Sequence, residues 1–248
     1  MAYAELHCHS NFSFLDGASH PEELAIEAAQ LGLSALALCD HDGLYGVVRF
    51  AEAARVVDLP TIFGAEITLA PARPRTGEPD PVGTHLVVLA RDATGYAGLS
   101  RCLAEAHLAG GAKGKPTFTL DDLAARHGGH WQVLTACRKG AVTQALMDSG
   151  PAGARRELRR LIERFGRERV TVELWDHGDP IDLPRNEALA HLAVEAGVGY
   201  LATGNVHYHT PKRFPLASTL SAVRARRSLD ELEGWLPAAP GAMLRSPA

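Results

Sequence analysis

The chain has 248 residues, of which 46% are hydrophobic and 22% charged, as in ordinary soluble proteins, so it could form one large α/β domain or two small ones. Its formal net charge of −4 disfavours a protein that coats nucleic acid, although a local basic groove stays compatible with it. No apolar run approaches the roughly 20 residues of a transmembrane helix and no signal peptide pattern is present, so we expect a cytoplasmic protein without a membrane partner.

Short apolar runs alternate with helical patterns along most of the chain. Seven runs are predicted to be strands, at residues 3–7, 34–39, 60–69, 85–90, 132–136, 170–174 and 199–202. A Ser19–Glu22 capping box predicts a helix that ends at Gly32. Further helices are predicted over 44–57, after caps at Thr94 and Thr119, on both sides of Gly150-Pro151, and over 187–196. The proline-rich segment 71–83 is predicted to be a surface loop.

The repeated strand–helix units predict a parallel sheet with right-handed crossovers, either open or closed into a barrel. Residues that commonly bind metals stand at the carboxyl ends of most strands, and those ends converge on one rim only in a barrel. The barrel is therefore the favoured α/β fold, with a site on that rim. The strand-end residues are His7, His9, Asp40, His41, Glu66, Cys137, Glu173, Asn205 and His207.

His7-Cys8-His9 places two imidazoles on one side of an extended segment and Cys8 on the other. His-x-His is a weak signal alone, but here it accompanies Asp16 and the other strand-end residues. Imidazole, carboxylate and thiolate ligands together suit zinc or a similar metal, and carboxylates can bridge two ions. The sequence therefore predicts a polynuclear metal site.

His85 and His107 compete for one place in this site. His85 begins the fourth strand, so we expect it on the rim opposite the ligands, in a structural role. His107 continues the apolar stripe of its helix and could be a core histidine or a ligand. Cys137 could be a buried apolar residue, but its place at a strand end favours a ligand.

Two further sets of charged residues have open roles. Asp40 and Asp42 flank His41 and could orient its imidazole as hydrogen-bond acceptors. The arginine-rich helix over 155–169 could face DNA, but interleaved glutamates favour a solvated surface.

The motifs together resemble the PHP (polymerase and histidinol phosphatase) domain of bacterial C-family DNA polymerases, over about residues 3–236. They are His-x-His (7–9), Phe-Ser-Phe-Leu-Asp-Gly (12–17), Asp-His-Asp (40–42), Gly-Ala-Glu (64–66), Thr-Ala-Cys (135–137) and Asn-Val-His (205–207). The stretches 175–178 and 202–209 are more similar to the error-prone branch of that family. The resemblance implies a distorted seven-stranded, TIM-like βα barrel that holds up to three metal ions.

The resemblance also implies three groups of ligands for two or three ions of zinc or manganese. The groups are His7, His9, Glu66 and Asn205; then Glu66, His107 and Cys137; then Asp16, His41 and His207. Asn205 departs from the pattern, because intact members of the family carry aspartate there. An amide brings no negative charge, so we expect the first ion to be held most weakly. No catalytic residue is assigned.

Residues 1–212 are expected to form the metal-binding barrel. Residues 213–248 are expected to form a C-terminal helix and the start of a linker toward a polymerase palm, since periodicity is lost from Arg224 on. Polymerisation itself needs the paired carboxylates of such a palm, which the family carries beyond this region.

Two functions stay open for this domain. The first is an accessory metal-holding module of an error-prone DNA polymerase that acts in DNA repair and in synthesis across damage. Its partners would be DNA, the other polymerase domains, the sliding clamp and mutagenesis accessory proteins. The second is an active metal-dependent phosphoesterase, either a 3′–5′ exonuclease or, with less support, a free-standing phosphatase. Asn205 favours the accessory module.

Overall fold

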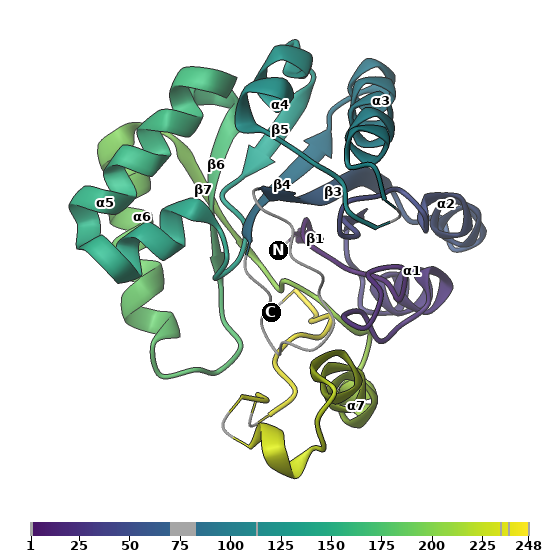
Figure 1. Ribbon diagram of the computed structural model, residues 1–248. Coiled ribbons are helices and arrows are strands. Elements are labelled where there is room, and N and C mark those ends of the chain that lie inside the picture. Colours follow the sequence, from purple (N-terminus) through teal and green to yellow (C-terminus); the bar gives the residue numbers. More distant parts are fainter. Residues whose placement is uncertain (1, 70–82, 113, 234, 238, 248) are drawn as a thin grey trace.

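The structure is a computed structural model that describes residues 2–69, 83–112, 114–233, 235–237 and 239–247. Seven strands form one sheet in the order of the chain, and the sheet curls into a barrel with helices outside it (Figure 1). The strands are β1 (Ala4–Glu5), β2 (Ala35–Leu38), β3 (Thr61–Leu69), β4 (Thr84–Ala90), β5 (Trp131–Leu134), β6 (Val170–Trp175) and β7 (Gly199–Thr203). The predicted barrel and all seven of its strands are confirmed. Of the predicted loop at 71–83, residues 71–82 lie outside the described residues.

The barrel closes through the segments that follow β1 and β7. Cys8 and Val206 form an isolated parallel bridge. The His9 amide donates to the Val206 carbonyl at 2.8 Å, and the Val206 amide donates to the His7 carbonyl at 2.8 Å. Both Cys8 and Val206 are completely buried. Side chains alternate along extended chain, so the residues that flank these two project to the other side, into the barrel.

The prediction of an all-parallel sheet is wrong at β4. This strand is antiparallel to both neighbours, with Glu66 opposite Val87 on β3 and Val87 opposite Leu134 on β5. The remaining pairs, β1–β2, β2–β3, β5–β6 and β6–β7, are parallel. β3 connects to β4 without a helix among the described residues, as an antiparallel pair allows. The amino-terminal end of β4 therefore lies at the rim where the other strands end.

The helices are α1 (Pro21–Gln30), α2 (Val47–Val56), α3 (Ala93–Ala109), α4 (Leu120–His127), α5 (Ala141–Phe165), α6 (Asp182–Ala196) and α7 (Phe214–Ala225). Thr119 caps α4 as predicted, and Gly150 interrupts α5 at the predicted place. The first capping box is shifted by one residue, because His20 is the N-cap and its amide donates to Glu23 at 2.8 Å. Asp92, not Thr94, caps α3.

Alternation along the strands divides the core into an outer and an inner part. Ala65 and Ile67 of β3 pack outward with the helices in one large cluster. A smaller cluster inside the barrel comes from β2, β4 and the end of β5. It consists of Ala37, Cys39, Val87, Leu89, Leu134 and Ala136. Since neighbouring side chains alternate, Glu66 points into the barrel, beside this inner cluster.

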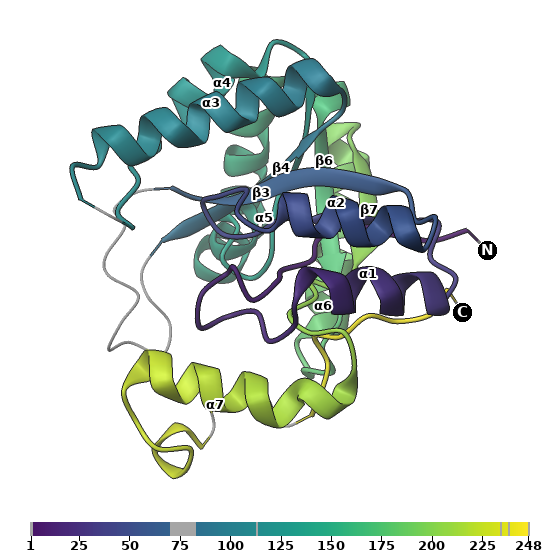
Figure 2. The same ribbon diagram turned by 90° about the vertical axis from the view of Figure 1, so that its right-hand side faces the viewer.

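The chain after β7 returns to the barrel. α7 lies between α6 and α1 in the ring of helices (Figures 1 and 2). Further on, Met243 forms a bridge with Tyr208, and the His207 amide donates to the Ala242 carbonyl at 2.9 Å. Leu244 is buried in the cluster under α1 and α2. None of the described helices combines the length and apolar character that crossing a bilayer demands.

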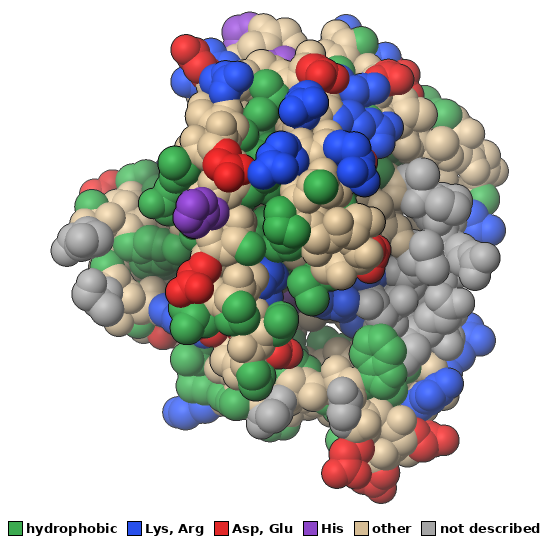
Figure 3. Space-filling model, turned by 90° about the vertical axis from the view of Figure 1, so that its left-hand side faces the viewer, with side chains coloured by type: hydrophobic (Ala, Val, Ile, Leu, Met, Phe, Trp, Pro, Cys, Tyr) green, Lys and Arg blue, Asp and Glu red, His purple; other side chains and the backbone are tan. Residues whose placement is uncertain are grey.

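The arginine-rich part of α5 forms an outer face of the molecule, where Lys and Arg side chains gather (Figure 3). Three of its arginines pair with carboxylates: Arg155 with Glu195, Arg160 with Glu157 and Arg164 with Asp121. Such pairs are common on a solvated helix surface.

Candidate metal centre

The barrel brings the strand-end residues to one cavity of about 530 Å³. The Cys8–Val206 bridge sets His7 and His9 beside Asn205 and His207, and a second bridge joins His41 to Glu66. Of the predicted ligands, those with side chains on the cavity wall are Asp16, His41, Glu66, His107, Cys137, Asn205 and His207. His7 and His9 are completely buried next to it.

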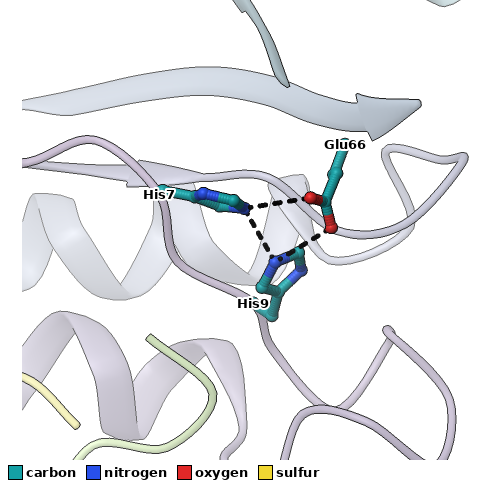
Figure 4. A group of neighbouring side chains, drawn as sticks. All are labelled: His7, His9 and Glu66. Atoms are coloured by element: carbon teal, nitrogen blue, oxygen red, sulfur yellow. Dashed lines mark hydrogen bonds and ion pairs between the residues drawn. The ribbon is translucent and has the colours of Figure 1, made fainter. Parts of the chain in front are cut away.

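Glu66 is the centre of the cluster, since both its oxygens are surrounded by imidazole nitrogens. Oε2 lies 3.1 Å from Nδ1 of His41 and 3.4 Å from Nε2 of His9. Oε1 lies 3.6 Å from Nε2 of His7 (Figure 4). The Nε2 atoms of His7 and His9 are 3.0 Å apart. Two atoms at about 2.1 Å from a tetrahedral zinc are about 3.4 Å apart, so the separations fit a shared ion.

Asn205 supports the same conclusion. Its side chain is 7% exposed, and its Oδ1 has no hydrogen-bond partner among the described residues. A buried amide oxygen without a partner is costly, and a cation in the cavity would satisfy it. The residues of the centre therefore fit a divalent metal.

The expected place of His85 on the opposite rim is wrong. Its Nδ1 lies 3.1 Å from Oε1 of Glu66 and 3.8 Å from Sγ of Cys137, and its side chain is buried. His85 begins β4, and since β4 is antiparallel, this start lies on the metal rim. His41, Glu66 and His85 form a second group with metal-binding geometry. Knowledge of the direction of β4 could have placed His85 on this rim, but the apolar pattern of the strand does not indicate its direction.

His107 also lines the cavity. Its Nε2 lies 2.8 Å from the carbonyl oxygen of Asp42 and 3.2 Å from the hydroxyl of Tyr45. The neighbours of Glu66 that the structure gives include His85 and Cys137, the latter with Sγ at 3.5 Å from Oε1. A ligand role for His107 stays a prediction.

Asp16 forms a separate subsite at the edge of the cluster. Its Oδ2 lies 2.7 Å from Nε2 of His41, and its Oδ1 lies 3.8 Å from Nδ1 of His207. Arg224 of α7 donates from Nη1 to Oδ1 at 2.6 Å. Burial alone would raise the pKa of Asp16, but His207, the hydrogen bond from His41 and Arg224 hold it well below its usual range. Asp16 is therefore ionised at neutral pH.

Glu173 contacts His7, which the sequence did not reveal. Its Oε1 lies 2.7 Å from Nδ1 of His7 and accepts a hydrogen bond from Thr203 at 2.5 Å. Burial alone would lower the pKa of His7, but Glu173 and Glu66 raise it to about 9. A carboxylate on one ring nitrogen fixes the tautomer and directs the other nitrogen to a metal.

Asp40 plays a comparable part for His9, although it was expected to orient His41. Its carboxylate accepts hydrogen bonds from the Ser10 hydroxyl at 2.7 Å and from the Ser13 hydroxyl at 2.8 Å. Ser13 Oγ in turn lies 3.2 Å from Nδ1 of His9. Asp42 accepts from the Thr68 amide at 2.7 Å. The two carboxylates thus hold loops and His9, whereas the neighbours of the His41 ring are Asp16 and Glu66.

The protonation states of the side chains in the cluster favour metal binding. Burial raises the pKa of Glu66, but His85, His41 and His7 outweigh it and hold that pKa well below its usual range. Burial lowers the pKa of His9 well below its usual range and that of His207 to about 4, so both imidazoles are neutral. Burial and Glu66 raise the pKa of Cys137, so its thiolate requires a cation nearby.

Backbone strain is concentrated next to the ligands. Four of the described non-glycine residues with positive φ stand at or beside a predicted ligand: Leu15 (61°), Asp42 (52°), Ala136 (62°) and Asn205 (40°). Each such conformation costs on the order of 1 kcal/mol and persists only where its surroundings enforce it. The loops that carry the ligands are therefore fixed by the fold.

The barrel and its centre define a member of the PHP family: residues 5–177 match the PHP domain, and the chain belongs to that family. The chain is 59% identical over 246 residues to the error-prone DNA polymerase of Mycobacterium tuberculosis. It is 56% identical to that of Cutibacterium acnes and 37% identical to that of Corynebacterium jeikeium. These matches cover 98–99% of this chain but only 22%, 22% and 19% of the relatives.

Solved structures support the fold alone. A protein of Bifidobacterium adolescentis described as a metal-dependent phosphoesterase matches with a TM-score of 0.58 at 18% identity, over 83% of this chain and 88% of its own. An amidohydrolase of Chromobacterium violaceum, solved with bound sulfate and no metal, matches with a TM-score of 0.58 at 20% identity. That match covers 84% of this chain and 88% of the other.

Proposed function

We propose that the chain is the N-terminal PHP domain of an error-prone DNA polymerase and that it holds a cluster of metal ions in an accessory, structural role. The identity of 59% across 99% of the chain carries this proposal. Residues 1–212 would be the barrel, and residues 213–248 would lead toward the other polymerase domains. The whole protein would synthesise DNA across damage, as a nucleotidyltransferase in the cytoplasm.

The metal would be zinc or manganese, in two or three ions. His7, His9, Glu66 and Asn205 would hold the first ion, and Glu66 with His85 and Cys137 the second. Asp16, His41 and His207 would hold the third. Imidazole, carboxylate and thiolate donors suit these metals. The ions would neutralise the acidic residues and bind the rim together, which adds to the free energy of folding.

Asn205 supports the accessory role. With an amide in place of a carboxylate, the first ion keeps only Glu66 as an anionic ligand, and it shares Glu66 with the second. Weak binding of one ion limits hydrolysis more than it limits structural binding, because hydrolysis relies on a complete arrangement of charges.

A second candidate function is a metal-dependent phosphoesterase, for which the open cavity beside the cluster is the specific observation. Bound metals would supply Lewis-acid chemistry toward a phosphate ester there. The side chains that line the cavity would bind and orient the ester, and Glu173 and Asp40 would hold the imidazoles in place.

DNA and the other domains of the same chain would be the partners of the accessory domain. The sliding clamp and mutagenesis accessory proteins are further partners that would act through the whole polymerase.

Elemental analysis of protein purified without chelators tests the proposal. We expect more than one zinc or manganese ion per chain, and a lower melting temperature with less metal in the double variant His7→Ala, His9→Ala. Metal below about 0.2 per chain after reconstitution would contradict specific binding. Hydrolysis of single-stranded DNA by the purified chain, lost in the double variant, would instead favour the second candidate.

A further inference from the structure

Arg224 extends from the last turn of α7 to the metal rim. Its Nη1 lies 2.6 Å from Oδ1 of Asp16, a residue 208 positions earlier in the chain. Both side chains are only 16% exposed, and both line the cavity beside the cluster. Arg224 is thus a partly buried cation at the place where a ligand of the cavity would meet the metals.

Asp16 contacts this cation and His41 through opposite oxygens, and Nδ1 of His207 lies 3.8 Å from the oxygen that Arg224 contacts. Oδ1 accepts from Arg224, while Oδ2 faces Nε2 of His41 at 2.7 Å. An ion held by Asp16, His41 and His207 would share one negative charge with the guanidinium. Two cations on one carboxylate repel each other, so an anion that bound between the guanidinium and the metal would relieve this repulsion.

The cavity offers the surroundings that an anion needs. Arg138 and Lys139 of the loop after β5 lie on its wall, and so do Ser218 and Ser221 on α7. A guanidinium binds the oxygens of a phosphate in pairs, with a planar geometry that an ammonium lacks.

We propose that Arg224 is the phosphate-binding residue of this cavity and takes a phosphate group once a metal occupies the Asp16 subsite. The proposal rests on metal binding as proposed above, but it holds for an accessory site that binds a phosphate as well as for a hydrolytic one.

A purely structural role for Arg224 makes a different prediction. α7 is tied to the barrel by an ion pair near each end, Arg213 with Glu23 and Arg224 with Asp16. Arg213 does not line the cavity. Arg213→Gln therefore removes one tie of α7 without touching the cavity and is the matched control for Arg224→Gln.

The experiment is calorimetric titration of inorganic phosphate into the manganese-loaded 248-residue chain, with metal content measured in the same samples. We expect Arg224→Gln to weaken phosphate binding by at least about tenfold, which corresponds to about 1.4 kcal/mol. Arg224→Lys should keep part of the affinity, because it retains charge without the planar fork. Arg213→Gln should bind phosphate as the parent does. Manganese binding by Arg224→Gln should be unchanged or tighter, since a competing cation is gone.

Other outcomes would overturn the proposal. Equal phosphate affinity in the parent, Arg224→Gln and Arg224→Lys would assign Arg224 to the support of α7, and equal losses of melting temperature in Arg224→Gln and Arg213→Gln would accompany it. Loss of manganese from Arg224→Gln would assign the residue to the metal centre. If Arg224→Gln does not fold, the phosphate affinity of Arg224→Lys decides the question. An unchanged affinity in that variant would show that the guanidinium does not bind the phosphate. A parent chain that binds no metal contradicts the proposed function instead.

Discussion

Glu173 Oε1 lies 2.7 Å from His7 Nδ1, and both side chains are wholly buried. The contact leaves Nε2 of His7 directed at His9 and Glu66, at 3.0 and 3.6 Å. A carboxylate on the strand next to the closing strand thus determines which nitrogen of His7 is offered to a metal.

We expect Glu173→Gln to lower metal affinity by about 10- to 100-fold, the usual effect of removing a carboxylate that supports a metal-bound histidine. An amide is nearly isosteric, but it no longer makes the imidazole more basic. Glu168→Gln, an exposed residue of the turn before β6, is the control for the lost charge. Metal titrations followed by competition with a chelator measure both, and equal affinity in the two variants would deny Glu173 this role.

The variants His85→Ala and His107→Ala distinguish the two histidines that compete for one ligand position. We expect His85→Ala to weaken one ion by at least about tenfold, or about 1.4 kcal/mol, because its Nδ1 lies 3.1 Å from Glu66. His107→Ala should retain that ion, since its Nε2 contacts the carbonyl of Asp42. Metal stoichiometry at limiting concentration measures the difference. The reverse result would restore His107 to the ligand set.

Asn205→Asp should tighten the first ion. The change alters charge with little change of shape, and an added carboxylate could supply one or two tenfold steps, each of about 1.4 kcal/mol. The variant should bind additional metal at limiting concentration and gain slow phosphodiesterase activity on single-stranded DNA. Gln30→Glu adds the same charge at an exposed position of α1 and should change neither quantity. A parent chain that already holds three tight ions and cleaves DNA as fast as the variant would contradict the accessory role.

In the metal-free chain, the contributions of His7 and His207 to stability should both be largest near pH 6.5. The pKa of His7 is raised to about 9, so its contribution is complete below about pH 6.5 and is lost as pH rises toward 9. The pKa of His207 is lowered to about 4, so stability is lost as pH falls from about 6.5 toward 4. Each shift corresponds to on the order of 3 kcal/mol.

Thermal unfolding in the presence of a chelator, from pH 4 to 9, measures this dependence. With metal bound, the alkaline loss should vanish, because His7 must be unprotonated to act as a ligand. His7→Gln should flatten the alkaline side in the metal-free chain. A metal-free parent with constant stability between pH 6.5 and 9 would rule out the raised pKa of His7.

Much of the barrel could be predicted from the sequence. Hydrophobic periodicity indicates its strands and helices, and the metal-type residues at the strand ends indicate that these ends meet at one rim. Glu66 stands out as an acid within an apolar strand, and His7 and His9 stand out by their spacing. The direction of β4 could not be predicted, since an apolar run of seven residues is compatible with a parallel strand and with an antiparallel one. That single missing fact placed His85 on the wrong rim.

The contacts that support the predicted ligands were harder to predict from the sequence than the ligands themselves. Asp40 reaches His9 through Ser13, and Glu173 reaches His7 across 166 residues of sequence. Sequence spacing does not report such neighbours, because they depend on how strands are ordered around the barrel. Arg224 belongs to the same class, since it contacts Asp16 across 208 residues of sequence.

Closure between Cys8 and Val206 also has a consequence for the order of events during synthesis. The Gly204 amide donates to Glu5 at 2.7 Å, across 199 residues. Before this last segment has left the ribosome, His7 and His9 lack their backbone hydrogen bonds to Val206, and Asn205 and His207 cannot join the cluster. Contacts of such long range form late, because the entropy of closing the intervening loop must be overcome first. If the rim binds metal as proposed, we therefore expect metal binding to follow translation of the whole barrel.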